Sequence, residues 1–191
     1  MTFYVRRLPH WQPPDADFFV TWRLYGSLPK APKLLLPSAT AGAAFVALDR
    51  QLDRAANGPL WLNNAQVAEC VSQTLLSGVS PWGFYDLLAW VVMANHVHVL
   101  LRPLIPLQKA LMNIKSGSAR AANAALGRTG KPFWQDESYD RWVRNDRERN
   151  SIVRYIHFNP VAAGLVTEPE QWPWSSAGWQ RTALPHIHPK T

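Results

Sequence analysis

Two histidines one residue apart, His96 and His98, are suited by type and spacing to metal chemistry. They lie in an alternating apolar segment that predicts a β-strand. Residues i and i+2 of a strand point to the same side, with Cα atoms about 6–7 Å apart, so both imidazoles can converge on one ion. A single His-x-His pair is a weak signal, and histidines that serve only packing or the surface are the commoner explanation of this spacing.

Tyr155 and Asn159 form a second candidate group. They are four residues apart in a segment of helical character, so they share one helical face with Ile152. An amide oxygen suits a hard divalent cation, and two imidazoles plus one amide leave positions for water or phosphate, which favours Mg²⁺ or Mn²⁺ over structural zinc. These residues can also be explained without any chemistry. Tyr155 would then be an ordinary core aromatic residue, and Asn159 would cap the C-terminal end of the helix before Pro160.

Hydrophobic periodicity predicts the elements that must position these groups. The expected strands cover residues 17–24, 84–92, 96–102 and 139–144. The expected helices cover residues 41–56, 64–76, 107–126 and 145–158. Asn145 or Asp146 can cap the last helix, and Pro160 and Gly164 are expected to end it. Strands interleaved with helices, including an antiparallel hairpin, indicate an α+β fold. A ferredoxin-like or RRM-like βαββαβ sandwich with a central antiparallel sheet is the simplest topology.

The expected helix over 107–126 has an apolar or small stripe and an opposite polar stripe. The polar stripe contains Lys109, Asn113, Ser116, Arg120 and Asn123. The span 102–128 holds five basic residues and no acidic residue. A solvated surface explains polar side chains in general, whereas the lack of carboxylates favours contact with phosphates, and both interpretations stay open.

Composition limits the class of protein. The 191 residues are 47% apolar and 17% charged, which suits one folded domain rather than a disordered chain. Twenty basic against thirteen acidic residues leave a net charge of +7, which favours an anionic partner without identifying it. Cys70 is the single cysteine, so no internal disulfide can form. The longest apolar run, 87–94, is far shorter than a membrane span, so we expect a soluble cytoplasmic protein.

The segment from Trp90 to Leu101, WVVMANHVHVLL, resembles the HUH signature of single-tyrosine transposases, where U is a bulky apolar residue. Residues 133–144 and 154–166 are similar to blocks of the REP-associated tyrosine transposases, relatives of single-strand insertion-sequence transposases. Further similar blocks occur in the family's order at residues 8–11, 19–24, 114–116 and 172–177. Two positions differ: Ala94 stands where proline is usual, and Gly117 where an aromatic residue is frequent.

The resemblance implies that Tyr155 is the catalytic nucleophile and that His96, His98 and Asn159 hold a divalent metal, Mg²⁺ or Mn²⁺. A tyrosine phenol, with a pKa of about 10, is a poor nucleophile at neutral pH, so the metal would make the phosphate more electrophilic and hold it for in-line attack. The expected reaction is cleavage and rejoining of single-stranded hairpin DNA through a 5′-phosphotyrosine link, without ATP.

The same resemblance implies a DNA partner and a location. We expect Lys109, Lys115 and Arg120 to contact phosphates, with tryptophans available to stack on unpaired bases. The expected protein is nucleoid-associated in the cytoplasm. It is expected to be a monomer like the REP-associated group, although the insertion-sequence relatives are dimers. Residues 1–166 are expected to form the nuclease domain, and 167–191 an irregular arm packed on it.

Two functions of other classes remain open. The protein could be a catalytically idle regulator that binds hairpin DNA. It could also be a metal-dependent phosphoesterase in which the histidine pair activates water and Tyr155 only positions the phosphate. His157 lies between Tyr155 and Asn159 in sequence but about 200° around the helix from Tyr155, so we expect a surface histidine outside the site.

Overall fold

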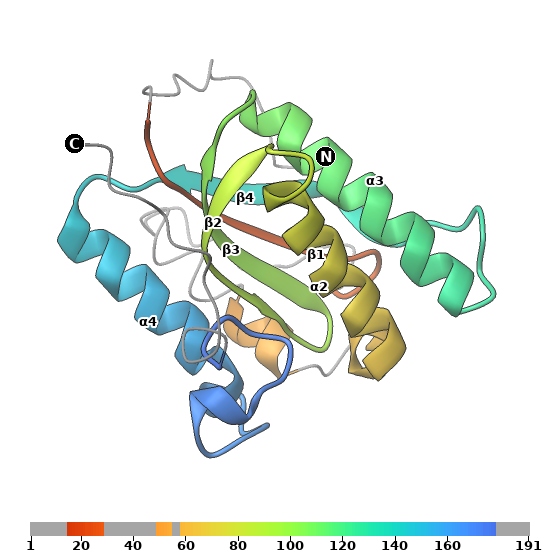
Figure 1. Cartoon of the computed structure of the whole chain (residues 1–191). Helices are drawn as coiled ribbons and strands as arrows, with labels where there is room; N and C mark the ends of the chain where they lie inside the picture. Colours follow the sequence, from red (N-terminus) through yellow and green to blue (C-terminus); the bar gives the residue numbers. More distant parts are fainter. Residues whose placement is uncertain (1–14, 29–48, 55–57, 179–191) are drawn as a thin grey trace, which may run out of the picture.

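The computed structural model describes residues 15–28, 49–54 and 58–178 (Figure 1). The helix expected over 41–56 is therefore described only near its end, where residues 49–53 are helical. The similar block at 8–11 and the end of the expected arm, 179–191, lie outside the described residues.

Four antiparallel strands form one sheet: β1 (Phe18–Leu24), β2 (Tyr85–Val92), β3 (His96–Pro103) and β4 (Trp134–Trp142). Their order is β2-β3-β1-β4, so the strands β1 and β3 lie in the centre. This order follows from a βαββαβ chain in which β2 and β3 are a hairpin. The structure confirms the expected α+β sandwich of ferredoxin-like type.

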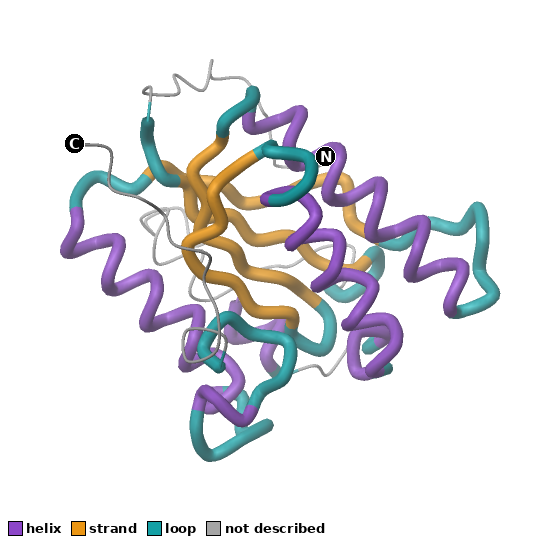
Figure 2. The backbone as a smooth tube through the Cα atoms, viewed as in Figure 1, coloured by secondary structure: helices purple, strands orange, loops and turns teal. Residues whose placement is uncertain are grey.

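The helices form layers on the two faces of the sheet (Figures 1 and 2). On one face, α2 (Ala65–Val79) and α3 (Leu107–Ala125) pack against each other and on the sheet. On the other face lies α4 (Asp146–Ala162). Two short 3₁₀ helices, Trp61–Asn63 and Pro169–Gln171, complete the described elements.

Strand alternation explains the two cores. In β1, Phe18, Val20 and Trp22 belong to the core under α2 and α3, whereas Phe19 joins Ile152 and Ile156 of α4. Both faces of β1 are buried, which accounts for its continuous apolar character. Residues of β1 and β3 with the same orientation as Phe19 therefore face the α4 layer.

The helix α4 begins and ends in recognisable ways. The Asn145 side chain accepts a hydrogen bond from the Glu148 backbone N–H, at 2.9 Å, and the Glu148 carboxylate accepts one from the Arg144 N–H. The first contact is the expected N-cap at Asn145. The second goes to the residue before the cap rather than to the Asn145 N–H, so the reciprocal pair of a capping box is not formed. The expected end at Phe158 is wrong: the helix continues through Pro160 to Ala162. Pro160 removes only one backbone donor, and its side chain is buried, so packing keeps the last turn helical.

The segment after the second 3₁₀ helix lies along the outer edge of β2. The backbone N–H of Val92 donates to Trp174, and that of Ser176 donates to Trp90. The Ser176 hydroxyl accepts from the Trp90 N–H and also contacts His157 Nε2 at 2.8 Å. The expectation of a surface His157 is therefore corrected: the ring is half-buried against this segment, and burial lowers its pKa.

Among the described helices, none has the length and apolar character needed to cross a membrane.

Candidate metal and nucleophile site

The strand β3 places His96 and His98 on the face of the sheet that α4 covers. Their cross-strand neighbours on β1 are Arg23 and Thr21. Both histidine side chains are completely buried. Their Nε2 atoms lie 3.0 Å apart, so the predicted convergence of the two imidazoles is present in the structure.

Asn95 fixes the tautomer of His96. The Asn95 Nδ2 donates to the Leu52 carbonyl at 3.0 Å, so its Oδ1 is the atom that faces His96 Nδ1 at 2.7 Å. Because Oδ1 can only accept, Nδ1 carries the proton, and Nε2 of the neutral ring presents a lone pair. The pKa of His96 is lowered to about 3 by burial and by His98, against the opposing effect of Asp49, so the ring is neutral at pH 7.

Contacts on two sides hold the ring of His98. Its Nδ1 lies 2.7 Å from the Thr21 hydroxyl on the neighbouring strand. Its flat side stacks on Phe19, with ring centroids 5.7 Å apart. These contacts direct His98 Nε2 toward His96 Nε2 and toward the helical segment 49–53.

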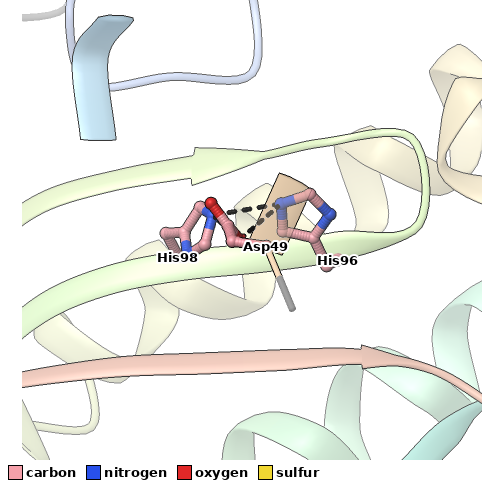
Figure 3. Close-up of side chains that lie close together, drawn as sticks. All are labelled: Asp49, His96 and His98. Atoms are coloured by element: carbon pink, nitrogen blue, oxygen red, sulfur yellow. Dashed lines mark hydrogen bonds and ion pairs between the residues drawn. The ribbon is translucent and has the colours of Figure 1, made fainter. Parts of the chain in front are cut away.

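Asp49, from that helical segment, completes a cluster that sequence reasoning missed. Its Oδ1 lies 3.2 Å from His98 Nε2 and 3.7 Å from His96 Nε2, and its side chain is almost fully buried. Figure 3 shows the carboxylate facing both imidazoles. Asp53, one turn later, has its Oδ1 3.8 Å from His96 Nε2. The sequence did contain one sign of this cluster: Asp49 and Asp53 are four residues apart in a largely apolar segment of helical character, so they share one helical face.

The electrostatics of the cluster favour a cation. Burial alone would raise the pKa of Asp49, but His98, His96 and a hydrogen bond from Asn159 outweigh burial and hold that pKa below its usual value. Burial and the charge of Asp49 raise the pKa of Asp53 to about 6. At neutral pH the pocket therefore holds a buried carboxylate beside a neutral imidazole, an arrangement that a bound cation would stabilise.

The helix α4 brings Asn159 and Tyr155 to the same place. Asn159 Nδ2 lies 3.4 Å from His98 Nε2, and the Asn159 Oδ1 is buried and accepts no hydrogen bond from the described residues. The half-buried Tyr155 ring lies edge-on to His98, with centroids 5.5 Å apart, and edge-on to Phe19 at 6.0 Å. The expected set of His96, His98, Tyr155 and Asn159 is thus contiguous in space.

The residues present fit a divalent metal. The cluster of Asp49, His96 and His98 offers one ligand atom per residue, all within 4.8 Å of one another. The Nε2 atoms of His96 and His98, 3.0 Å apart, both face the Asp49 carboxylate, so these three side chains would hold the ion together. The buried Asn159 oxygen adds a further donor without a hydrogen-bond partner among the described residues. Two imidazole nitrogens and two oxygens can together hold a divalent ion.

The predicted DNA contacts lie elsewhere. Lys109, Lys115 and Arg120 are on α3, which covers the face of the sheet opposite to α4. Lys109 and Arg120 are exposed. The ammonium of Lys115 donates to the carbonyls of Gln135 and Asp136, both at 2.8 Å, so it links α3 to β4. The structure does not bring this basic face together with Tyr155.

Comparison with known families agrees with this geometry. A family model described as "Transposase IS200 like" matches residues 62–159, about half of the chain. The chain belongs to the IS200-like transposase family. The matched segment contains both histidines, Tyr155 and Asn159, whereas Asp49 and Asp53 precede it.

Two individual proteins are similar to this chain at low sequence identity. The chain is 27% identical over 97 residues to the REP-associated tyrosine transposase of Escherichia coli (strain K12), an alignment that covers 48% of this chain and 54% of that protein. The chain thus spans about half the length of this curated relative. A solved structure of a REP-associated tyrosine transposase bound to a REP hairpin covers 99% of this chain and 89% of its own, with a TM-score of 0.56 and 18% identity. That similarity confirms the fold.

Proposed function

We propose that this protein cleaves and rejoins single-stranded, hairpin-forming DNA through a covalent link to Tyr155. The observation that carries the proposal is the meeting of a tyrosine from α4 with a buried two-histidine cluster from β3. The family membership and the hairpin-bound structure of a similar protein support the choice of DNA as substrate. A REP-type hairpin is the substrate class that we propose for this chain.

Each side chain has a distinct part in the proposed mechanism. His96, His98, Asn159 and Asp49 would hold a divalent metal, Mg²⁺ or Mn²⁺, which when bound supplies charge neutralisation and electrophilic activation at the scissile phosphate. Asn95 and Thr21 keep the two imidazoles in orientation. Phe19 and His98 position the Tyr155 ring beside that cluster through edge-on packing.

The proposed cleavage exchanges one phosphate ester for another. The Tyr155 phenolic oxygen attacks phosphorus, a bond from this oxygen to the 5′-phosphate forms, and the bond from phosphorus to the 3′-oxygen breaks. The phenol loses a proton and the leaving 3′-oxygen gains one, so a free 3′-hydroxyl results. A second 3′-hydroxyl can reverse the step and rejoin the strand. The ester bond is retained throughout, so no nucleotide cofactor is needed.

A denaturing gel tests this proposal directly. The full chain would be incubated with Mn²⁺ and a pool of end-labelled single-stranded hairpin oligonucleotides, and covalent protein–DNA species would be counted. We expect an adduct that is lost in Tyr155→Phe and on addition of EDTA. Tyr139→Phe is the matched control, because Tyr139 is also half-buried on this face and edge-on to Phe19. That control should keep the adduct.

The other outcomes point to the competing functions. An adduct that persists in Tyr155→Phe would overturn the assignment of the nucleophile. Free 5′-phosphate ends without an adduct would indicate a phosphoesterase that uses water. Tight hairpin binding without any cleavage would indicate a regulatory binding protein.

A further inference from the structure

The exposed side of α4 next to Tyr155 carries both basic and aromatic side chains. At about 100° per residue, Tyr155 lies at the border between the buried face of the helix and this exposed side. On one side of it, Ile152, Ile156 and Asn159 are buried. On the other side, within about 100° of Tyr155, the exposed residues are Ala162 at the end of the helix and four residues with larger side chains before it. These four, here called the α4 stripe, are Arg147, Ser151, Arg154 and Phe158.

The aromatic member of the stripe is unusually accessible. Phe158 keeps 46% of its surface exposed, although phenylalanine is ordinarily a core residue. The guanidinium of Arg154 lies over its ring, 5.5 Å from the centroid. The pair therefore presents a flat apolar surface next to a positive charge, within one helical turn of Tyr155.

The positive charges of the stripe are not neutralised by neighbouring carboxylates. The two acidic residues of α4 are engaged elsewhere: Asp146 pairs with Arg149, and Glu148 pairs with Arg141. Arg147 and Arg154 form no ion pair within the described part of the chain. Both guanidinium groups thus remain available to an external anion.

A second arginine–aromatic pair precedes the helix in the chain but lies on the other face of the sheet. Trp142, at the end of β4, is 41% exposed, and the Arg144 guanidinium lies 6.0 Å from its ring centroid. Trp142 is the cross-strand partner of Phe18, which belongs to the core under α2 and α3, so its side chain points away from α4. The arginine–aromatic pair next to Tyr155 is therefore the one that belongs to the α4 surface.

We infer that the α4 stripe is the surface that binds single-stranded DNA next to the phosphate that Tyr155 attacks. Arginines recognise phosphates through charge and paired N–H donors, and an exposed aromatic ring stacks on a base only if that base is unpaired. Duplex DNA would use the guanidinium groups but leave Phe158 without a partner. This inference rests on the proposed function, because it takes its strand from the substrate of Tyr155.

The location distinguishes this surface from the basic face of α3. A strand whose phosphate reaches Tyr155 lies on the α4 side of the sheet, so it contacts the stripe within a few nucleotides. To reach Lys109 and Arg120, the same strand would have to pass around the edge of the sheet. Removal of the positive charges from α4 should therefore weaken DNA binding more than removal of the charges from α3.

Binding of fluorescent oligothymidylate to the full chain, followed by anisotropy in EDTA across a series of KCl concentrations, tests the inference without any cleavage. Arg147→Gln with Arg154→Gln should weaken binding about tenfold at low salt. It should also lower the slope of log affinity against log salt by about 1.4, or 0.7 for each phosphate contact on a single strand. Phe158→Leu should weaken binding several-fold and leave the slope unchanged, because stacking releases no counterions.

Two controls make the result specific. Lys109→Gln with Arg120→Gln removes the same charge from α3, and Lys131→Gln removes an exposed charge from the turn before β4. We expect the α3 pair to change the slope less than the α4 pair, and Lys131→Gln to change it little. Photo-cross-linking of a thiothymidine oligonucleotide to the unmodified chain should label residues 147–158 rather than 107–126. Because this experiment uses no variant, its result does not depend on whether the variants fold.

The outcomes separate this inference from the proposed function. An unchanged slope in the α4 pair, or a larger loss in the α3 pair, would overturn the inference even if Tyr155 still forms an adduct. Loss of binding in the α4 pair together with labelling of α4 would support it even if no adduct ever forms, and in that case only the catalytic proposal fails.

Discussion

At the scale of single residues, Asp49 decides the charge of the candidate site. His96 is neutral at pH 7, and Asn159 contributes only a dipole, so the Asp49 carboxylate is the negative charge closest to both imidazoles. Its depressed pKa shows that the folded protein favours the ionised form. A carboxylate ligand raises affinity for a divalent cation, because ligand charge is a main determinant of such affinities.

Asp49→Asn should therefore weaken Mn²⁺ binding by about tenfold or more, with little change in the shape of the pocket. Titration calorimetry on the metal-free protein measures the affinity. The rise in unfolding temperature on addition of Mn²⁺ gives a second readout, since a ligand stabilises only the state that binds it. Asp136→Asn, on an exposed residue of β4, is the matched control. Equal affinities of the two variants would show that Asp49 is not a ligand.

The residues of the site differ in how far sequence predicts them. The histidine pair is predictable because strand geometry fixes the orientation of residues i and i+2, and Tyr155 and Asn159 because helix geometry does the same for i and i+4. Asp49 was not predicted, because its distance from the histidines depends on how the helical segment 49–53 docks on the sheet. No local periodicity records that docking.

At the scale of elements, α4 combines two tasks. Its buried face brings Asn159 to the cluster of Asp49, His96 and His98 and packs Ile152 and Ile156 on the sheet, and its exposed face carries the α4 stripe. Tyr155 lies between the two faces, so any rotation or fraying of the helix would displace the proposed nucleophile relative to His98. The capping contacts at Asn145 are therefore important for the site as well as for the fold.

Asn145→Ala should destabilise the protein by about 1 kcal/mol, since it leaves the Glu148 N–H without its side-chain acceptor. Urea unfolding followed by fluorescence measures the change. Asn150→Ala makes the same substitution at an exposed position inside the helix, where alanine has the higher helix propensity, so it should be neutral or slightly stabilising. A loss as large in Asn150→Ala as in Asn145→Ala would mean that the cap is not the cause.

Element type was predictable, and element length was less so. The sequence predicted β4 around 139–144, whereas the strand covers Trp134–Trp142. Its first half, with Gln135, Asp136 and Glu137, lacks a strand pattern because the pairing with β1 shifts register between Trp22 and Leu24, so these residues lie in an irregular part of the ladder. The helix α4 likewise extends past Pro160, since tertiary burial outweighs the local cost of proline.

At the scale of the whole molecule, the sheet divides the protein into two sides with different roles. The larger core, under α2 and α3, holds the strands in register. The smaller core, under α4, surrounds the histidine cluster. The net charge of +7 says only that the molecule attracts anions. The architecture adds that a strand bound at Tyr155 would contact the α4 side, whereas the polar stripe over 107–126 led to a prediction of phosphate contacts on α3.

The C-terminal segment 172–178 lies against the edge strand β2. We predict that the domain needs this segment for its stability. Its backbone pairs with the otherwise open edge of β2, the Trp172 indole donates to the Val92 carbonyl at 2.9 Å, and Ala177 is buried. A chain ending at Val166 should lose about 2–4 kcal/mol of unfolding free energy relative to one ending at Gly178, because the hydrogen bonds of this segment to Trp90, Val92 and His157 and part of the smaller core disappear.

Urea unfolding of the two shortened chains and of the full chain measures this difference. Ser176→Ala in the full chain provides a milder version that does not depend on truncation. It removes the acceptor of the Trp90 N–H and the contact with His157, so about 1–2 kcal/mol should be lost. Ser116→Ala, on the exposed side of α3, should cost little by comparison. If the chain ending at Val166 were as stable as the longer ones, residues 172–178 would be an appendage and β2 would tolerate an open edge.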